Sequence, residues 1–149
     1  MSVSLRIADS ADFDRARALV AAFHSEQGTG GLDIDAALSP LLDGLPHAVL
    51  YLIGPPKSPV GYALVSFGYA IDMGGPVATL AELFIRPPVR GRGMGSEAVN
   101  ALATALARHG IRALHMDAAA TNPRATVFCR RLGFAPRDSH TTMTRRFPS

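Results

Sequence analysis

Hydrophobic and polar residues alternate near the start of the chain and then change to helical spacing. Residues 3–7 alternate polar and apolar side chains, which predicts a half-buried strand. Between residues 10 and 24 the apolar side chains recur at intervals typical of a buried helix face, so we expect a helix there. A shorter helix is predicted over about residues 34–42, and Pro40 weakens it.

Longer apolar runs in the middle of the chain predict extended strands over residues 47–53, 60–71 and 77–85. Turns rich in glycine and proline separate these runs. Because the connections are short, we expect the strands to pair as an antiparallel meander.

Helical spacing returns in the second half of the chain. A helix is predicted over about residues 93–108, followed by a strand over residues 113–117. Because a helix crosses between them, this strand can lie parallel to the strand before it. A last helix should begin at Pro123 with Asn122 as its cap, and a final hairpin should close with a strand over residues 141–147. The pattern predicts an α/β (α+β) fold with a mixed, mostly antiparallel central sheet flanked by helices.

Composition describes a folded chain with a basic surplus. The 149 residues suffice for one domain with a full core, and 48% hydrophobic with 18% charged residues are typical of a globular protein. The net charge is +3, and Lys57 is the only lysine. Such a surplus could serve nucleic acid or an anionic cofactor. The chain has no long basic run interleaved with aromatic residues, so we expect no nucleic acid partner.

Several classes of protein are disfavoured by what the sequence lacks. Cys129 is the only cysteine, which rules out an intrachain disulfide and suits a reducing cytoplasm. The N-terminus shows no signal peptide, and no apolar stretch approaches the ~20 residues that cross a bilayer. The histidines lack the spacing of metal ligands. We therefore expect a cytoplasmic protein with no membrane partner and no metal site.

A basic, glycine-rich turn between the strand that ends near residue 85 and the next helix carries the strongest functional signal. Its glycines let the backbone bend, and the first helical N–H groups have no intrahelical partner. The helix dipole and the nearby arginines favour an anion there. The turn therefore predicts a phosphate or pyrophosphate site, with an ordinary solvent loop as the alternative. It consists of Arg90, Gly91, Arg92, Gly93, Met94, Gly95 and Ser96.

Comparison with known phosphate-binding motifs narrows the kind of ligand. A P-loop needs a lysine after its glycines, and Ser96 and Glu97 stand there instead. A dinucleotide-binding fingerprint needs a further glycine where Ser96 lies. Asp117 does imitate the acidic residue that binds ribose, so a nucleotide-binding domain stays open as an alternative.

The segment Arg90–Gly95 resembles the Arg/Gln-x-x-Gly-x-Gly/Ala signature of the GNAT superfamily, the acetyl-CoA-dependent N-acetyltransferases. Similar motifs stand in the right order on both sides, in residues 81–87 before it and around Asn122 and Gly133 after it. The resemblance covers roughly residues 60–147, and the part before matches more loosely.

The resemblance implies a cofactor and residues that bind it. Residues 1–149 would form a single GNAT-type domain that uses acetyl-CoA as co-substrate. The glycine turn would hold the pyrophosphate, and Asn122 would contact the cofactor. The acetyl-pantetheine end would hydrogen-bond to the strand backbone at Leu83, Phe84 and Ile85.

Candidates for the acceptor side come from two stretches. In the family the N-terminal helices help to wall the acceptor site, which points to His24, Glu26 and Gln27, although we favour solvated helix-end residues here. Glu82 is the one acid on the strand at the cleft, so it is a candidate base, acting directly or through water. A structural carboxylate paired with an arginine is an equally supported alternative.

Cys129 departs from the family pattern. The family's usual proton donor to the departing thiolate is a tyrosine four residues before the glycine that ends the last helix, and Cys129 stands at that position. A thiol could donate the proton. Cys129 also lies on the apolar stripe of its helix, and we slightly favour packing as its role. Water or Tyr69 would then serve, or the thiolate would leave unassisted.

These observations predict an N-acetyltransferase that acts on the primary amine of a small molecule, with a loose resemblance to the spermidine/diamine type. A protein amine stays open as the acceptor, as does assembly into a homodimer. The alternative from another class is an acetyl-CoA-binding or CoA-binding sensor that has lost catalysis, which Cys129 in place of the tyrosine would explain.

Overall fold

The computed structural model describes residues 3–118, 122–137 and 139–148. The chain divides into two compact units, Met1–Asp117 and Ala118–Ser149. The first unit holds the sheet, and the second holds α4 (Pro123–Arg131). Each unit has its own part of the predicted motifs: the glycine turn lies in the first, and Asn122 and Cys129 lie in the second.

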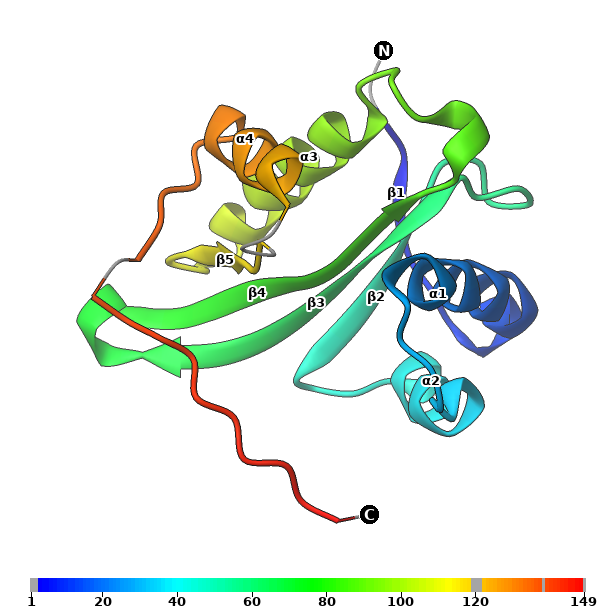
Figure 1. Ribbon diagram of the computed structural model, residues 1–149, viewed down its shortest axis with the longest axis horizontal. Coiled ribbons are helices and arrows are strands. Elements are labelled where there is room, and N and C mark those ends of the chain that lie inside the picture. The colour runs from blue at the N-terminus through cyan, green and yellow to red at the C-terminus, as the bar shows by residue number, and fades with distance from the viewer. Residues whose placement is uncertain (1–2, 119–121, 138, 149) are drawn as a thin grey trace. The chain divides into compact units, whose positions relative to one another are not determined.

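The sheet of the first unit contains five strands in the order β1-β2-β3-β4-β5 (Figure 1). Neighbours from β1 to β4 pair antiparallel, and β5 pairs parallel with β4. This arrangement confirms the predicted meander, the parallel strand and the mixed, mostly antiparallel fold class. The strands are β1 (Leu5–Ile7), β2 (Ala48–Ile53), β3 (Gly61–Ala70), β4 (Gly75–Ile85) and β5 (Leu114–Met116).

The helices of the first unit cover both faces of this sheet. In Figure 1, α1 (Phe13–Gln27) and α2 (Ile34–Asp43) lie on one side, and α3 (Met94–Arg108) lies on the other. One buried cluster joins α1 and α2 to the sheet, because their apolar stripes face the same strands. Its members include Leu19, Val20, Leu38, Leu42, Leu50, Leu52, Tyr62 and Phe84.

A β-bulge shapes β4 next to the predicted base. Leu64 pairs with Glu82, but the next residue, Val65, pairs with Leu80, so Ala81 is an extra residue on β4. On the other edge, β4 pairs with β5 only over Ala78–Leu80 among the described residues. Within the described ranges, the part of β4 that follows the bulge therefore has no strand paired on its β5 side, as expected for strands that separate at their C-terminal ends.

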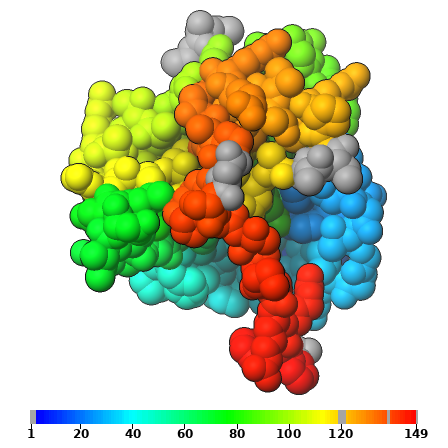
Figure 2. Space-filling view, turned by 60° about the vertical axis from the view of Figure 1, so that its left-hand side comes forward, coloured from blue at the N-terminus to red at the C-terminus, as the bar shows by residue number. Residues whose placement is uncertain are grey.

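The predicted closing strand over residues 141–147 is wrong. The described residues from 139 to 148 contain neither strand nor helix, and all of them are exposed (Figure 2, in red). Met143 and Phe147 are 87% and 81% exposed, respectively. The threonines of this segment suggest a strand, but a strand needs a paired edge and a buried face to be stable. The segment has no buried side chain that could supply that face.

Candidate active site

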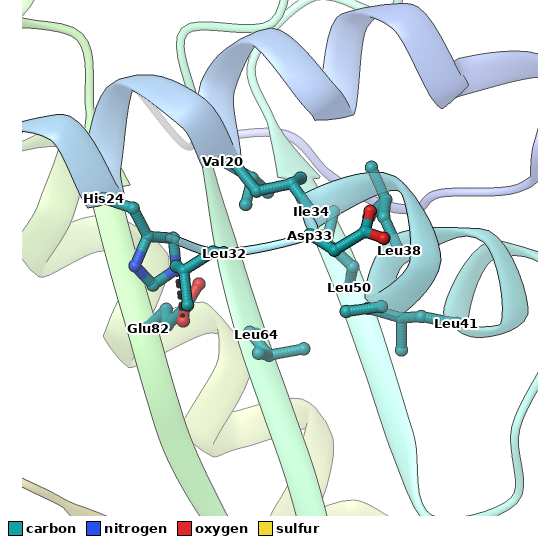
Figure 3. A pocket seen from close by; sticks show the side chains of 11 residues that line it. Val20, His24, Leu32, Asp33, Ile34, Leu38, Leu41, Leu50, Leu64 and Glu82 are labelled. Atoms are coloured by element: carbon teal, nitrogen blue, oxygen red, sulfur yellow. Dashed lines mark ion pairs between the residues drawn. The ribbon is translucent and has the colours of Figure 1, made fainter. Parts of the chain in front are cut away.

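A pocket of about 310 Å³ opens between α1, α2 and the face of the sheet that these helices cover. Figure 3 shows side chains from α1, α2, β2, β3 and β4 around it. Its walls are mainly aliphatic, and Leu32 contributes a half-exposed side chain. The aliphatic lining includes Val20, Leu38, Leu41, Leu50 and Leu64.

Glu82 and His24 lie at one end of this pocket and face each other (Figure 3). The Nε2 atom of His24 lies 2.9 Å from Oε2 of Glu82, and both side chains are less than one-fifth exposed, at 18% and 19%. On the other side, the hydroxyl of Tyr62 donates a hydrogen bond of 2.7 Å to Oε1 of Glu82. Both oxygens of the carboxylate are therefore held in place before any ligand binds.

Burial decides the direction of the bond between Tyr62 and Glu82. Tyr62 is fully buried, and burial, together with the hydrogen bond to Glu82, raises the pKa of its phenol far above the usual value. The hydroxyl therefore stays protonated at physiological pH and can only donate to the carboxylate. Among the described residues, the partners of Glu82 are Tyr62 and His24 and not an arginine, which does not support the alternative of a carboxylate paired with arginine.

An aromatic cluster fixes the ring of His24 and the strand beside it. Phe23 packs edge-to-face against His24, Tyr62 and Phe84, with ring centroids 5.0, 6.0 and 6.2 Å apart, respectively. Such edge-to-face pairs restrict ring rotation and stabilise the cluster beyond the area they bury. The end of the pocket that carries Glu82 is therefore rigid.

His24 is the site residue that the sequence interpretation placed wrongly. We expected a solvated helix-end residue, but the side chain is 18% exposed and contacts Glu82. Its Nδ1 atom is buried and has no hydrogen-bond partner among the described residues. The sequence held a usable signal, because His24 follows Val20 by four residues and so falls on the buried stripe of α1.

The end of β4 meets the last turn of α1 through Arg90. Its Nε donates to the carbonyl of Ile85 at 2.7 Å, and its Nη2 contacts both carboxylate oxygens of Glu26 at 2.8 and 2.9 Å. The guanidinium also lies over the ring of Phe84, 5.4 Å from its centroid. Arg90 is therefore held by three partners, although its side chain, like that of Arg92, is exposed. Gln27 is exposed as well, as we expected.

The glycine turn itself presents open backbone. Gly91 and Gly93 have φ of 81° and 78°, which favour glycine, and a Cβ at either position would meet no atom within 4 Å. Gly93 is the N-cap of α3 and has no side chain to cap it. The N–H groups of Met94, Gly95 and Ser96 precede the first helical hydrogen bond, from Glu97 N–H to Gly93 O at 3.0 Å. These groups suit the phosphates of a bound anion.

Comparison with known proteins decides the family. The model of the acetyltransferase (GNAT) family matches residues 17–134. The chain belongs to the GNAT acetyltransferase family. Among curated proteins, none matches the chain.

Solved structures share the fold of this chain. A protein of Arthrobacter sp. FB24 proposed to be an acetyltransferase is 28% identical, with a TM-score of 0.75 over 98% of this chain and 95% of that one. A ribosomal-protein-alanine N-acetyltransferase from Brucella melitensis biovar Abortus 2308 is 14% identical, with a TM-score of 0.79 over 99% and 100%. The aminoglycoside acetyltransferase meta-AAC0020 from an uncultured soil metagenomic sample is 13% identical, with a TM-score of 0.75 over 99% and 95%.

The second unit of this GNAT protein carries two further predicted site residues. The side chain of Asn122 accepts hydrogen bonds from the N–H groups of Arg124 and Ala125 at 3.1 and 3.3 Å, which confirms it as the cap of α4. Cys129 is 8% exposed, and burial raises the pKa of its thiol. The thiol is therefore protonated at neutral pH. Contact of Asn122 with a cofactor, and proton donation by Cys129, stay predictions.

Tyr69 does not lie where a proton donor to the GNAT chemistry was expected. It is 74% exposed and pairs with Pro76 near the other end of β3. Glu82 pairs with Leu64, so Tyr69 lies five residues, or roughly 17 Å, further along the strand. The length of β3 therefore removes Tyr69 from the candidates.

Neither a cluster of metal ligands nor a membrane-spanning helix is found within the described ranges. No three His, Cys, Asp or Glu side chains within those ranges gather as metal ligands. No helix there combines the length and the apolar surface that crossing a bilayer requires.

Proposed function

We propose that this GNAT protein is an N-acetyltransferase that moves an acetyl group from acetyl-CoA to the primary amine of a small molecule. The observation that carries the proposal is the carboxylate of Glu82, held by Tyr62 and His24 at the end of an apolar pocket. A pocket of about 310 Å³ suits part or all of a small acceptor. The lone Cys129 suits a cytoplasmic setting for this enzyme.

Glu82 supplies the base that the reaction requires. An amine with a pKa near 10 is almost wholly protonated at neutral pH, so a proton must leave before the nitrogen can attack. Glu82 accepts that proton, directly or through water. The nitrogen then forms a bond with the acetyl carbon, the carbon–sulfur bond breaks, and CoA leaves as a thiolate. The new amide nitrogen releases its second proton, and the thiolate gains one from water or from Cys129, whose thiol is then reprotonated by the released proton.

The backbone beside Glu82 supplies the remaining contacts. After the bulge, β4 has no strand paired on its β5 side among the described residues, so the peptide groups of Leu83 and Ile85 suit the pantetheine arm. Phe84 pairs with Tyr62, so its own peptide groups face β3. A backbone N–H near Phe84 or Ile85 stabilises the oxyanion. Arg90 occupies the carbonyl of Ile85 in this structure. We therefore expect that contact to be exchanged when acetyl-CoA binds. The glycine turn with Arg92 holds the pyrophosphate.

The test is release of free CoA thiol in the presence of acetyl-CoA and an amine, with Glu82→Gln as the decisive variant. Gln keeps the shape of the side chain and removes its basicity, so we expect kcat to fall by about 10²- to 10⁴-fold. Asp43→Asn is the matched control, because Asp43 is an exposed acid outside the pocket lining. A normal rate in Glu82→Gln would show that Glu82 is not the base.

A sensor that binds acetyl-CoA without transfer is the second candidate, and Cys129 at the position of the family's tyrosine favours it. The two functions differ in the same assay. Saturable binding of acetyl-CoA together with no thiol release over a broad panel of amines would support the sensor. An equal thermal shift with NAD would instead indicate a nucleotide-binding domain.

A further inference from the structure

We infer that the acceptor of this enzyme is a monoamine with an apolar body, such as an arylalkyl or branched alkyl amine. This inference rests on the proposed function and names its substrate class. It departs from the spermidine/diamine type that the sequence suggested. The pocket wall between its two acidic residues is the feature that carries it.

The charges of the pocket lie at separate places, with hydrocarbon between them. Of the described residues that line it, only Asp33 and Glu82 carry carboxylates. Figure 3 shows these two side chains apart, with the aliphatic side chains of Leu32, Ile34 and Leu64 between them and around them. Asp33 is exposed, and its Oδ1 already accepts a hydrogen bond of 3.1 Å from Ala36 as the cap of α2. Only Glu82 therefore stands inside the pocket as a partner for an amine.

Binding of a polyamine in such a pocket would be unfavourable. With one amine at Glu82, its next ammonium group would lie against aliphatic side chains and give up water without gaining a partner. The hydroxyls of an aminoglycoside would lose hydrogen bonds with water in the same way. An apolar body does the opposite, because each buried CH₂ group strengthens binding. The lining thus discriminates by the body of the acceptor, while Glu82 and His24 recognise its single amine.

The experiment compares acceptors that differ in the size of their apolar body and in the number of further polar or charged groups. We would measure kcat/KM by thiol release for butylamine, hexylamine and phenethylamine, and for spermidine and kanamycin at equal ionic strength. We expect kcat/KM to rise by about fourfold for each CH₂ group that enters the pocket. We expect spermidine and kanamycin to fall below butylamine.

Variants of the apolar pocket lining test recognition of the acceptor separately from acetyl transfer. Leu32 is 47% exposed, so Leu32→Gln should fold, and it should raise KM for phenethylamine several-fold while kcat stays near normal. Ile71→Gln is the matched control, because Ile71 is 89% exposed and does not line the pocket. Phenethylamine binding, measured by calorimetry with CoA present, should weaken in Leu32→Gln only.

The outcomes separate this inference from the proposed function. Efficient transfer to spermidine or kanamycin, with poor transfer to phenethylamine, would overturn the inference and leave the acetyltransferase intact. Equal kcat/KM across the alkylamines would also overturn it, since the wall would then make no contact with the acceptor. Binding of phenethylamine that depends on Leu32 but brings no thiol release would keep the ligand class and overturn the enzyme.

Discussion

The two ends of the site are built from different parts of the polypeptide. At the acceptor end, side chains hold one another: Glu82 accepts a hydrogen bond from Tyr62 and contacts His24, and Phe23 packs against both of these partners. At the glycine turn, a Cβ on Gly91 or Gly93 would meet no atom within 4 Å, and no described side chain caps the first N–H groups of α3. Glu82 has its partners within the protein, whereas in the proposed function the contacts of the glycine turn come from acetyl-CoA.

This difference matters for catalysis and for binding in separate ways. A carboxylate held by Tyr62 and His24 needs no reorganisation before it acts as the proposed base, and such preorganisation favours efficient proton transfer. A turn of exposed glycines can close on phosphates of varied conformation, but its order depends on the ligand. Substitutions at Glu82 and the side chains that hold it should therefore change kcat, and substitutions at the turn should change acetyl-CoA affinity.

Blocking the open backbone should have the largest effect. Gly93→Glu puts a carboxylate where the pyrophosphate would lie and strains a backbone with φ of 78°. We expect it to abolish the rise in melting temperature with acetyl-CoA, which for the wild type should correspond to about 2.7 kcal/mol at 100 times Kd. Thermal shift with and without acetyl-CoA measures this.

Gly110→Glu is the control for the strain alone. Gly110 has φ of 84°, a Cβ there would also meet no atom within 4 Å, and it lies at the other end of α3. It should lose similar stability but keep its response to acetyl-CoA. Loss of the response in both variants would mean that strain, not the pyrophosphate site, explains the effect.

Removing one hydrogen-bond donor to Glu82 should have a smaller effect. It should lower kcat and leave acetyl-CoA binding unchanged, whereas Gly93→Glu should abolish binding. Tyr62→Phe takes away the donor to Oε1 of Glu82 and leaves the ring in its cluster. We expect kcat to fall by about tenfold, equivalent to ~1.4 kcal/mol for a hydrogen bond to a charged group, with acetyl-CoA affinity unchanged. Tyr69→Phe, on the exposed end of β3, should change neither quantity. A loss of stability alone would reduce Tyr62 to a packing role.

The same contrast explains what could be predicted from the sequence. The glycine turn is local, so its residues stand together in the sequence and their chemistry is visible before folding. The strands, α3 and the cap of α4 were predictable for the same reason, because period and capping act over a few residues. Glu82 was identifiable as an acid on a strand that leads into the turn.

The partners of Glu82 were not predictable in this way. His24, Tyr62 and Glu82 come from α1, β3 and β4. The register of β3 on β4 and the packing of α1 on the sheet bring them together. Register depends on contacts across the whole sheet rather than on local propensity. The closing strand failed for the converse reason, since residues 141–147 have local strand propensity but lack a buried face.

Low pH should weaken the ion pair between Arg6 and Asp12, which stabilises the start of α1. This helix carries His24 of the acceptor end. Hydrogen bonds from Arg6 lower the pKa of Asp12 to about 2 against the opposing effect of burial, and the N–H of Asp9 adds to the lowering. Because the folded-state pKa lies below the usual value of 3.8, the stabilisation is present above about pH 4 and is lost as pH falls toward 2. Asp12→Asn should cost about 1–2 kcal/mol at pH 7 and little at pH 2, by urea unfolding. An equal cost at both pH values would contradict this.

Asn122 tests whether the second unit contributes to cofactor binding as well as to its own helix. Asn122→Ala removes the cap of α4 and should cost ~1 kcal/mol of stability. Asn122→Ser retains a capping oxygen and should recover most of that loss. If both variants bind acetyl-CoA as tightly as the wild type, Asn122 is a cap only, and the cofactor site depends on the glycine turn without it.

Cys129 should show the smallest effect and decides whether a side chain of the second unit takes part in the chemistry. The thiol is buried, and its raised pKa keeps it protonated, which suits packing and also leaves a proton to donate. We expect packing, so Cys129→Ala should lower stability modestly through a small cavity and leave kcat near normal. Cys129→Tyr should then destabilise the protein by overpacking.

A fall in kcat of ~10²-fold in Cys129→Ala, with activity retained in Cys129→Tyr, would instead identify Cys129 as the acid that protonates the departing thiolate. One rate and one melting curve for each variant distinguish the two roles, because packing lowers the melting temperature and proton donation lowers kcat.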